Sequence, residues 1–296
     1  MEVMDPGEWG EAEKLQRWVG RRILGVGKRV ADAVVQGELG LLSMKGRRML
    51  LRLTYWSKIL KMDKGRLVRR VYEAGRTAHA ANKAVKNWAS RTHQWLGELG
   101  LEECWKKQEI AEDWQDTVRA KISELEERDW TAGMTSKPKI ARYRTWKKTL
   151  GREAYLDERE NEQGRRSLTK CRGGALELRV ETGRWETMRV RGAVVKLQRH
   201  QRICEVCFRG VEDEMHFVMK CPAYTADRNV VLAKAARGMG FGAQLAGKIV
   251  AGQYKGGNNA AEEELLTWAL NGEGQKLAMR FLRSAVRRRK QILEEF

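Results

Sequence analysis

The spacing of cysteine and histidine between Cys204 and Cys221 constrains this chain more than any other feature of its sequence. Cys204 and Cys207 are two residues apart, His216 follows after eight more residues, and Cys221 after another four. A Cys-x2-Cys pair can grip one metal ion from a tight turn, and a histidine with a third cysteine completes a tetrahedron of ligands. Four nitrogen and sulfur ligands without an open position are typical of structural Zn²⁺. We therefore expect one structural zinc ion bound by these four side chains.

Two other interpretations of the cluster stay open. A redox Cys-x-x-Cys pair would follow a strand and open a helix, and no such pattern precedes Cys204. Unliganded buried thiols are the second alternative. Cys104 and Cys171 have no partner at ligand spacing and are expected in the core. His200 is expected at the surface.

Charged residues surround the four candidate ligands. Arg202, Arg209 and Lys220 are close in sequence and would offset the net negative charge of three thiolates, one imidazole and Zn²⁺. The acids at 212–214 can be interpreted as catalytic carboxylates or as Mg²⁺ ligands. They precede an apolar helix-like run, so we favour acidic residues at a helix N-terminus.

The net charge predicts a polyanionic partner. Lys and Arg number 58 against 39 Asp and Glu, which gives a formal charge of +19. Nucleic acid is the commonest partner of so basic a chain, although basic residues also serve solubility. The excess is clustered, with ten bases and one acid in 45–70 and six bases without an acid in 280–290. Six arginines near the cysteines are the candidate phosphate contacts: Arg165, Arg166, Arg172, Arg179, Arg184 and Arg202.

Length and composition limit the other possibilities. A chain of 296 residues exceeds one ordinary core, so we expect two or three compact regions. No apolar run approaches a membrane span, and the acidic start MEVMDPGEWGEAEK is unlike a secretory signal. Five cysteines, an odd number, fit a reducing intracellular compartment.

Hydrophobic periodicity predicts a mainly α chain with four regions. Residues 1–95 form a basic helical region, and 96–162 an acidic, Trp-rich helical region. Residues 163–228 form a small Arg-rich module stabilised by Cys3His zinc binding. Residues 229–296 form a helical tail with a basic face.

Two sets of apolar residues are assigned to the core by this reading. Met49, Leu53, Trp56 and Leu60 share one helical stripe, with Arg47 and Lys58 on the far side. The tryptophans of the acidic region could stack on bases, but no basic groove surrounds them, so we expect them between helices. They are Trp95, Trp105, Trp114 and Trp130.

Several stretches resemble one known family. EDEMHFVMKCPAY, followed by Arg228, resembles the zinc-binding segment at the C-terminal end of LINE-type non-LTR retrotransposon reverse transcriptases. RRSLTKCRGGALELRVETGRW and YRTWKKTLGREAYL resemble the two segments that precede it there. LQRWVGRRILGV and ELGLLSMKGRRMLLRLTYWSKILKM resemble the helical region after the polymerase thumb. The resemblance covers roughly residues 10 to 230. A retroviral nucleocapsid knuckle differs, because it has four residues between its second cysteine and its histidine.

This resemblance implies a post-thumb and zinc-binding tail, with Cys204, Cys207, His216 and Cys221 as ligands. Such a tail would hold template RNA or target DNA, beside the rest of the polyprotein. The chain departs from the family in lacking Tyr-x-Asp-Asp, and no nuclease constellation, Ser/His/Asp arrangement or phosphate loop is found. We therefore expect a nucleic-acid-binding module that has no catalytic activity, binds no membrane and takes no small-molecule substrate. A protein-docking module that uses the acidic Trp-rich region, and a truncated relic of a retroelement, are the alternatives.

Overall fold

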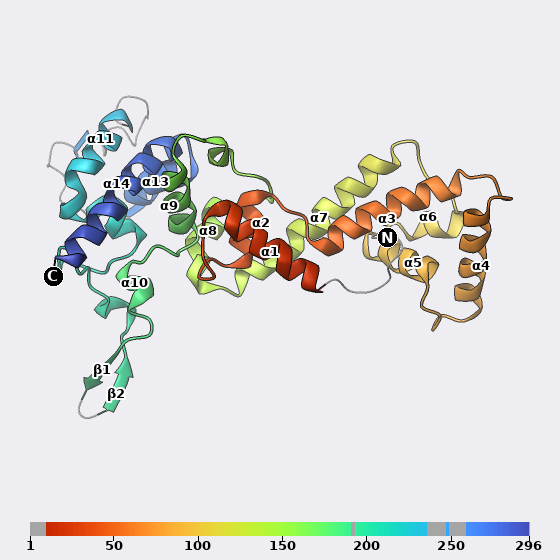
Figure 1. Cartoon of the computed structure of the whole chain (residues 1–296), viewed down its shortest axis with the longest axis horizontal. Coiled ribbons are helices and arrows are strands. Elements are labelled where there is room, and N and C mark those ends of the chain that lie inside the picture. Colours follow the sequence, from red (N-terminus) through yellow and green to blue (C-terminus); the bar gives the residue numbers. More distant parts are fainter. Residues whose placement is uncertain (1–9, 191–192, 236–246, 249–258, 296) are drawn as a thin grey trace. The chain divides into compact units, whose positions relative to one another are not determined.

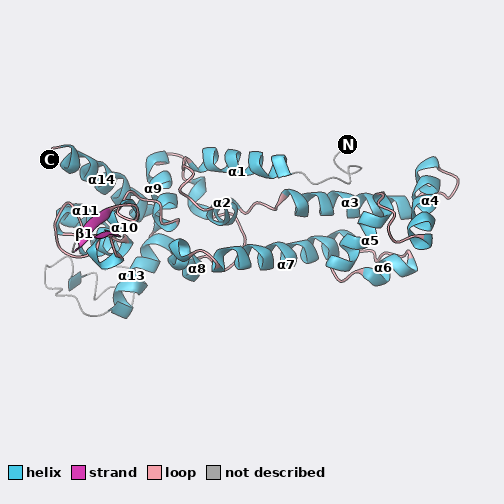
Figure 2. Ribbon diagram, turned by 90° about the horizontal axis from the view of Figure 1, so that it is seen from below, coloured by secondary structure: helices cyan, strands magenta, loops and turns pink. Residues whose placement is uncertain are grey.

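The computed structural model shows a mainly α-helical chain (Figures 1 and 2). It describes residues 10–190, 193–235, 247–248 and 259–295. The chain divides into two compact units: 1–19 with 40–133, and 20–39 with 134–296. The four regions inferred from sequence texture are regions of composition, and the structure groups their helices into these two units.

Helices account for most of the described elements. In chain order the α-helices are α1 (Gly10–Leu24), α2 (Asp32–Leu39), α3 (Met44–Leu60), α4 (Leu67–Ala81), α5 (Trp88–Glu98), α6 (Glu102–Lys107), α7 (Trp114–Thr135), α8 (Ala141–Trp146), α9 (Glu162–Arg172), α10 (Arg179–Thr182), α11 (Thr225–Ala235), α13 (Asn259–Asn271) and α14 (Gln275–Glu294). Short 3₁₀ turns are η1 (Pro138–Ile140), η2 (Ala154–Asp157), η3 (Arg199–Gln201) and η5 (Pro222–Tyr224), and η4 (His216–Lys220) is a π-helix.

Tryptophans and the α3 stripe form the core of the first unit. Met49, Leu53 and Trp56 are buried and Leu60 packs against them, which confirms the stripe. The four tryptophans of the acidic region are all buried, so their assignment to the core is also confirmed. The Trp56 indole donates a hydrogen bond to the Tyr72 hydroxyl (2.9 Å). A buried indole needs such an acceptor, which ties α3 to α4.

Arginine also enters the first unit's core. The guanidinium of Arg52 lies 5.2 Å from the ring centroid of Trp88 and 4.9 Å from that of Trp95. These distances are those of cation–π contacts. Arg47 and Lys58 are exposed on the opposite face, as the periodicity predicts.

The second unit is built on the contact of α9 with α14. The ring of Phe217 lies between Tyr224 (4.8 Å between centroids) and Phe281 of α14 (6.1 Å). Phe281 and Ala285 are buried. The predicted basic face is exposed, which confirms the amphipathic assignment: Arg280, Arg283, Arg287 and Lys290.

A two-stranded antiparallel hairpin is a secondary-structure feature that the sequence analysis did not predict. Strand β1 (Thr187–Val190) pairs with β2 (Ala193–Lys196), with Thr187 opposite Lys196 and Val190 opposite Ala193. Figure 1 shows the hairpin extending away from the helices of its unit. Both faces of β2 are exposed, so no buried face produced a readable alternation of polar and apolar residues.

Part of the predicted helical tail lies outside the described residues, at 236–246 and 249–258, as does the acidic start at 1–9. Among the described helices, none is both long and apolar enough to cross a membrane.

Candidate metal centre and its surroundings

The structure brings the four predicted ligands together. The ligand atoms of Cys204, Cys207, His216 and Cys221 all lie within 4.8 Å of one another. Cys207 Sγ is 3.2 Å from His216 Nε2. In a tetrahedral site with Zn–S bonds of about 2.3 Å, the sulfurs are about 3.8 Å apart, so one ion of this size suits the cluster. Three sulfurs and one imidazole nitrogen are also donors that Zn²⁺ accepts. The group is therefore able to hold a metal ion.

A tight backbone turn presents Cys204 and Cys207. The main-chain N–H of Cys204 donates to the carbonyl of Gly210 (2.9 Å), and the N–H of Phe208 donates to the carbonyl of Cys204 (2.9 Å). Phe208 and Gly210 have φ of +57° and +85°. A positive φ is uncommon for residues other than glycine, so the conformation of Phe208 must be stabilised by the hydrogen bonds of this turn. The turn directs both thiols of the Cys-x2-Cys pair to one point.

A π-helical turn presents the other two ligands. The N–H of Cys221 donates to the carbonyl of His216 (2.7 Å), five residues earlier. In an α-helix, residues five apart point about 140° away from each other around the axis. A π-helix has more residues per turn and reduces this angle. The π-helix η4 therefore explains how a four-residue gap can place both side chains on one ion.

The thiols interact strongly with one another. A hydrogen bond from Cys221 holds the pKa of Cys204 well below its usual range, and burial raises the pKa of Cys207. The Cys204 thiol is therefore the first of the three to ionise. A metal ion that binds the group would release the protons of the other two thiols.

Glu212 connects the cysteine cluster with the C-terminal helix. Its side chain has no exposed surface, and Oε1 is 3.6 Å from Cys204 Sγ. Arg289 of α14 donates to both carboxylate oxygens (2.8 and 2.9 Å), and the N–H of Arg179 donates to Oε2 (2.7 Å). Burial raises the pKa of Glu212 and Arg289 lowers it. Both oxygens of the Glu212 carboxylate therefore accept hydrogen bonds from arginine.

The other two acids of the 212–214 run differ in role. Asp213 accepts the N–H of His216 (2.9 Å), so it caps the helical turn as predicted. Glu214 pairs with Arg142 of α8 (3.1 Å). Asp213 therefore caps the turn and also pairs with Arg199 (2.9 Å), and Glu212 and Glu214 make ion pairs across the unit.

The cation buried beside the cluster is Arg228, and it differs from the three predicted neighbours. Arg228 donates to the carbonyls of Val218 (2.8 Å) and Cys221. Burial lowers its pKa to about 10, and the neighbouring Cys221 raises it. A buried cation needs a compensating negative charge, and Arg228 forms no ion pair with a described residue. A metal bound by three thiolates and an imidazole carries one negative charge and would compensate it.

The predicted neighbours have other surroundings. Lys220 pairs with Glu262 (2.6 Å), and Arg209 is exposed. Arg202 donates to the carbonyls of Val180 and Leu197 (both 2.9 Å). The sequence analysis expected these three residues to offset the negative charge of the metal site because they are close to the ligands in sequence. Closeness in sequence does not show where a side chain points.

The six candidate phosphate contacts fall into three groups. Arg172 is fully buried between Glu38 (2.9 Å) and Glu153 (3.3 Å) and holds the fold, so a phosphate cannot reach it. Arg165 donates to the carbonyl of Leu156 (2.9 Å), and Arg166 is an exposed residue paired with Glu162.

The last three of these arginines lie near residues 204–221, which we call the cysteine module. Arg179 pairs with Glu186 and with Glu205 (3.2 Å). Arg184 and Arg202 line one pocket. Arg172 lines the same pocket, so the structure groups three of the six there, and it adds Lys139, Arg142 and Arg199, which the sequence analysis did not single out.

No protein-family model, curated protein or solved structure matches the chain.

Proposed function

We propose that the chain is a nucleic-acid-binding module in which the Cys3His group holds one structural Zn²⁺. The observation that carries the proposal is a row of cations on α14. Arg280, Arg283 and Arg287 are exposed, and none forms an ion pair with a described residue. Exposed cations on one helix face can follow the phosphates of a nucleic acid, and the net charge of +19 acts in the same direction.

A structural role for zinc is supported by what surrounds the ligands. Cys204 and Cys221 are buried, and all four ligands come from protein side chains. Catalytic zinc keeps a coordination position for water or substrate, and four protein ligands fill a tetrahedron. The metal would hold the turn at 204–210 and η4 together, and through Glu212 and Arg289 it would fix α14.

The resemblance noted above extends the proposal to a cellular context. The chain would act as the tail of a LINE-type reverse transcriptase that holds template RNA or target DNA beside the rest of the polyprotein. No catalytic step is assigned to the chain. A retroelement relic without present activity is the reading that remains if no nucleic acid binds.

Fluorescence anisotropy across a salt series tests the proposal. The zinc-loaded full chain is titrated into labelled single-stranded RNA and duplex DNA, with polyglutamate as a polyanion that carries no bases. We expect tighter binding to nucleic acid and a log–log salt slope steeper than about −3. A flat salt response, or equal weak binding to all three probes, would sink the proposal.

A second function, docking onto another protein, is favoured by one apolar surface. Leu67 and Val71 of α4 are 73% and 62% exposed, and Val68 lies between them. Adjacent exposed apolar side chains on a helix are typical of an interaction surface. The acidic Trp-rich region offers no such surface through its tryptophans, because all four are buried. Sedimentation of the chain against a Leu67→Lys/Val71→Lys variant distinguishes self-association from a monomer.

A further inference from the structure

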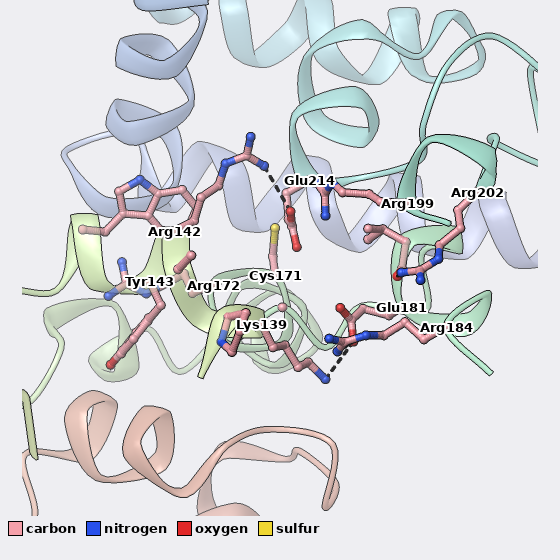
Figure 3. A pocket seen from close by; sticks show the side chains of 15 residues that line it. Lys139, Arg142, Tyr143, Cys171, Arg172, Glu181, Arg184, Arg199, Arg202 and Glu214 are labelled. Carbon is pink, nitrogen blue, oxygen red and sulfur yellow. Dashed lines mark hydrogen bonds and ion pairs between the residues drawn. The ribbon is translucent and has the colours of Figure 1, made fainter. Parts of the chain in front are cut away.

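A pocket of about 480 Å³ lies in the second unit, next to the cysteine module (Figure 3). Its wall is formed by η1 and α8, the end of α9, α10, η3 and the start of the metal-site helical turn. Six cations and two carboxylates line it: Lys139, Arg142, Arg172, Arg184, Arg199, Arg202, Glu181 and Glu214. A pocket with this excess of cations suits an anion.

One side of the pocket is already balanced in charge. Arg142 reaches Glu214 (3.1 Å) and Glu263 (2.9 Å), as Figure 3 shows for Glu214. Arg172 faces Glu38 and Glu153 behind the wall. An anion gains little on this side.

The other side has more cations than carboxylates, even though Arg199 pairs with Asp213 (2.9 Å). Glu181 is shared by Lys139 (3.0 Å) and Arg184 (3.3 Å). Arg202 beside them bonds only main-chain carbonyls and forms no ion pair with a described residue. Burial lowers the pKa of Arg202, and the charges of Arg184 and Arg199 lower it further, while the charge of Glu181 raises it. Glu181 and Asp213 together do not balance the four cations on this side, and a bound anion would offset the remaining positive charge.

An exposed tryptophan adjoins this side. Trp185 follows Arg184 in the chain and is 79% exposed, far more than a tryptophan in a core. Lys196 of β2 lies 5.9 Å from its ring centroid. Arg184 and Trp185 precede strand β1, and Arg199 follows strand β2. The N–H of Leu197 donates to the carbonyl of Glu186 (2.9 Å) and closes the base of the hairpin between these residues. Exposed indoles next to cations are the platforms on which unpaired bases stack.

We infer that this pocket binds a phosphate group of a single-stranded nucleic acid between Arg184, Arg199 and Arg202, with a neighbouring base stacked on Trp185. Arginine recognises phosphate through paired N–H groups. Arg184 and Arg199 each bond one carboxylate through a single nitrogen, Glu181 (3.3 Å) and Asp213 (2.9 Å), and their other N–H groups have no partner among the described residues. The strand must be single, because a base has to be unpaired to lie on an indole. The inference rests on the proposed function and names the surface that performs it.

The test compares variants in binding to labelled oligothymidylate of about twelve nucleotides and to an abasic strand of the same length. Arg184→Gln/Arg199→Gln removes two positive charges from the pocket rim. Lys106→Gln/Lys107→Gln removes two from exposed positions in the acidic region and is the matched control. Arg199→Gln alone, at a 61% exposed side chain, serves if the double variant fails to fold, which circular dichroism reports.

We expect the pocket double variant to weaken oligothymidylate binding at least tenfold. Its log–log salt slope should be shallower by about 0.7, because one neutralised phosphate on a single strand contributes about that much. The control variant should keep the wild-type slope. Trp185→Ala should weaken binding of oligothymidylate and leave binding of the abasic strand unchanged.

The outcomes separate the inference from the function on which it rests. If the wild type binds with a steep salt slope and the pocket variant equals the control, the inference is overturned and the proposed function stands. If the wild type binds no strand in a salt-dependent way, the proposed function fails and the inference with it. If pyrophosphate or a mononucleotide competes as tightly as the strand, the pocket binds free phosphates. The inference that its phosphate belongs to a nucleic-acid strand is then overturned.

Discussion

Arg289 and Glu212 form a two-point ion pair that fastens the C-terminal helix to the segment between Cys207 and His216. The two N···O distances are 2.8 and 2.9 Å, the Glu212 side chain has no exposed surface, and that of Arg289 is 12% exposed. Removing one partner of such a pair leaves an uncompensated buried charge. The cysteine cluster and α14 are therefore coupled in stability.

Arg289→Met should lower the free energy of unfolding by about 3–5 kcal/mol, because the Glu212 carboxylate stays buried without its cation. Glu212→Gln/Arg289→Met should lose less than Arg289→Met alone, since the charge is gone. Urea unfolding measures both, and Arg287→Met is the control on the same helix, at an exposed position. A change for Arg289→Met within about 0.5 kcal/mol of the control would contradict the coupling.

Metal removal should unfold the cysteine module and spare the core of the first unit. A structural zinc site contributes folding free energy on the order of 10 kcal/mol. After chelation or Cys207→Ser, amide exchange should accelerate at Cys204, Phe208 and Cys221, whose N–H groups are bonded in the two turns. Cys104→Ser is the control, because that thiol lies outside the cluster.

Amides of α3 provide the internal reference for this exchange experiment, since their helix has its own buried stripe. Equal protection of the module with and without metal, together with no bound zinc by elemental analysis, would refute the ligand assignment. Loss of protection along the whole chain would show that the metal supports more than its module.

Arg228→Met should weaken zinc binding about 10- to 100-fold, the usual effect of losing an outer partner of a metal ligand. The side chain holds the carbonyls of Val218 and Cys221 and places a buried positive charge beside the thiolates. Competition with a chromogenic chelator gives the affinity. Arg209→Met, at an exposed position in the turn at 204–210, should bind zinc as the wild type does. Equal zinc affinities for the two variants would show that Arg228 does not support the metal site.

Local patterns predicted the elements that depend on neighbours in sequence. The α3 stripe, the buried tryptophans and the four clustered ligands follow from spacing alone. The role of Arg172 did not, because its partner Glu38 is 134 residues away and an arginine in a basic stretch looks exposed. The pocket was missed for the same reason, since its cations come from four separate segments. The hairpin lacks a buried face, so it left no periodic signal.

Arg172→Met should destabilise the second unit by about 3–5 kcal/mol, because Glu38 would keep a buried charge. Both side chains have no exposed surface, and Arg172 also donates to the carbonyl of Leu270 (2.8 Å). Thermal unfolding measures the loss, with Arg166→Met on the exposed face of α9 as the control. If Arg172→Met unfolds as the wild type does but binds nucleic acid more weakly, the arginine is a phosphate contact after all.

Tyr72 should make the first unit sensitive to alkali. Burial raises the pKa of Tyr72, and its hydroxyl accepts from Trp56 (2.9 Å) while donating to Gln108 (2.6 Å). In the unfolded chain a tyrosine ionises near about pH 10. A group with a raised folded-state pKa contributes stability that is complete below the unfolded pKa and is lost as pH rises through the folded pKa. The loss should therefore begin near the unfolded value and continue above it.

Tyr72→Phe separates this effect from general alkaline unfolding. At neutral pH the variant should be less stable by about 1–3 kcal/mol, because the buried Trp56 N–H loses its acceptor. Above the unfolded tyrosine pKa the wild type should lose up to about 1.4 kcal/mol per pH unit more than the variant, so the two stability curves converge. Urea unfolding at stepped pH gives the curves, and the difference in phenolate absorbance between the two proteins gives the titration of Tyr72 itself. Parallel curves across this range would show that the hydroxyl ionises equally in the folded and unfolded chain.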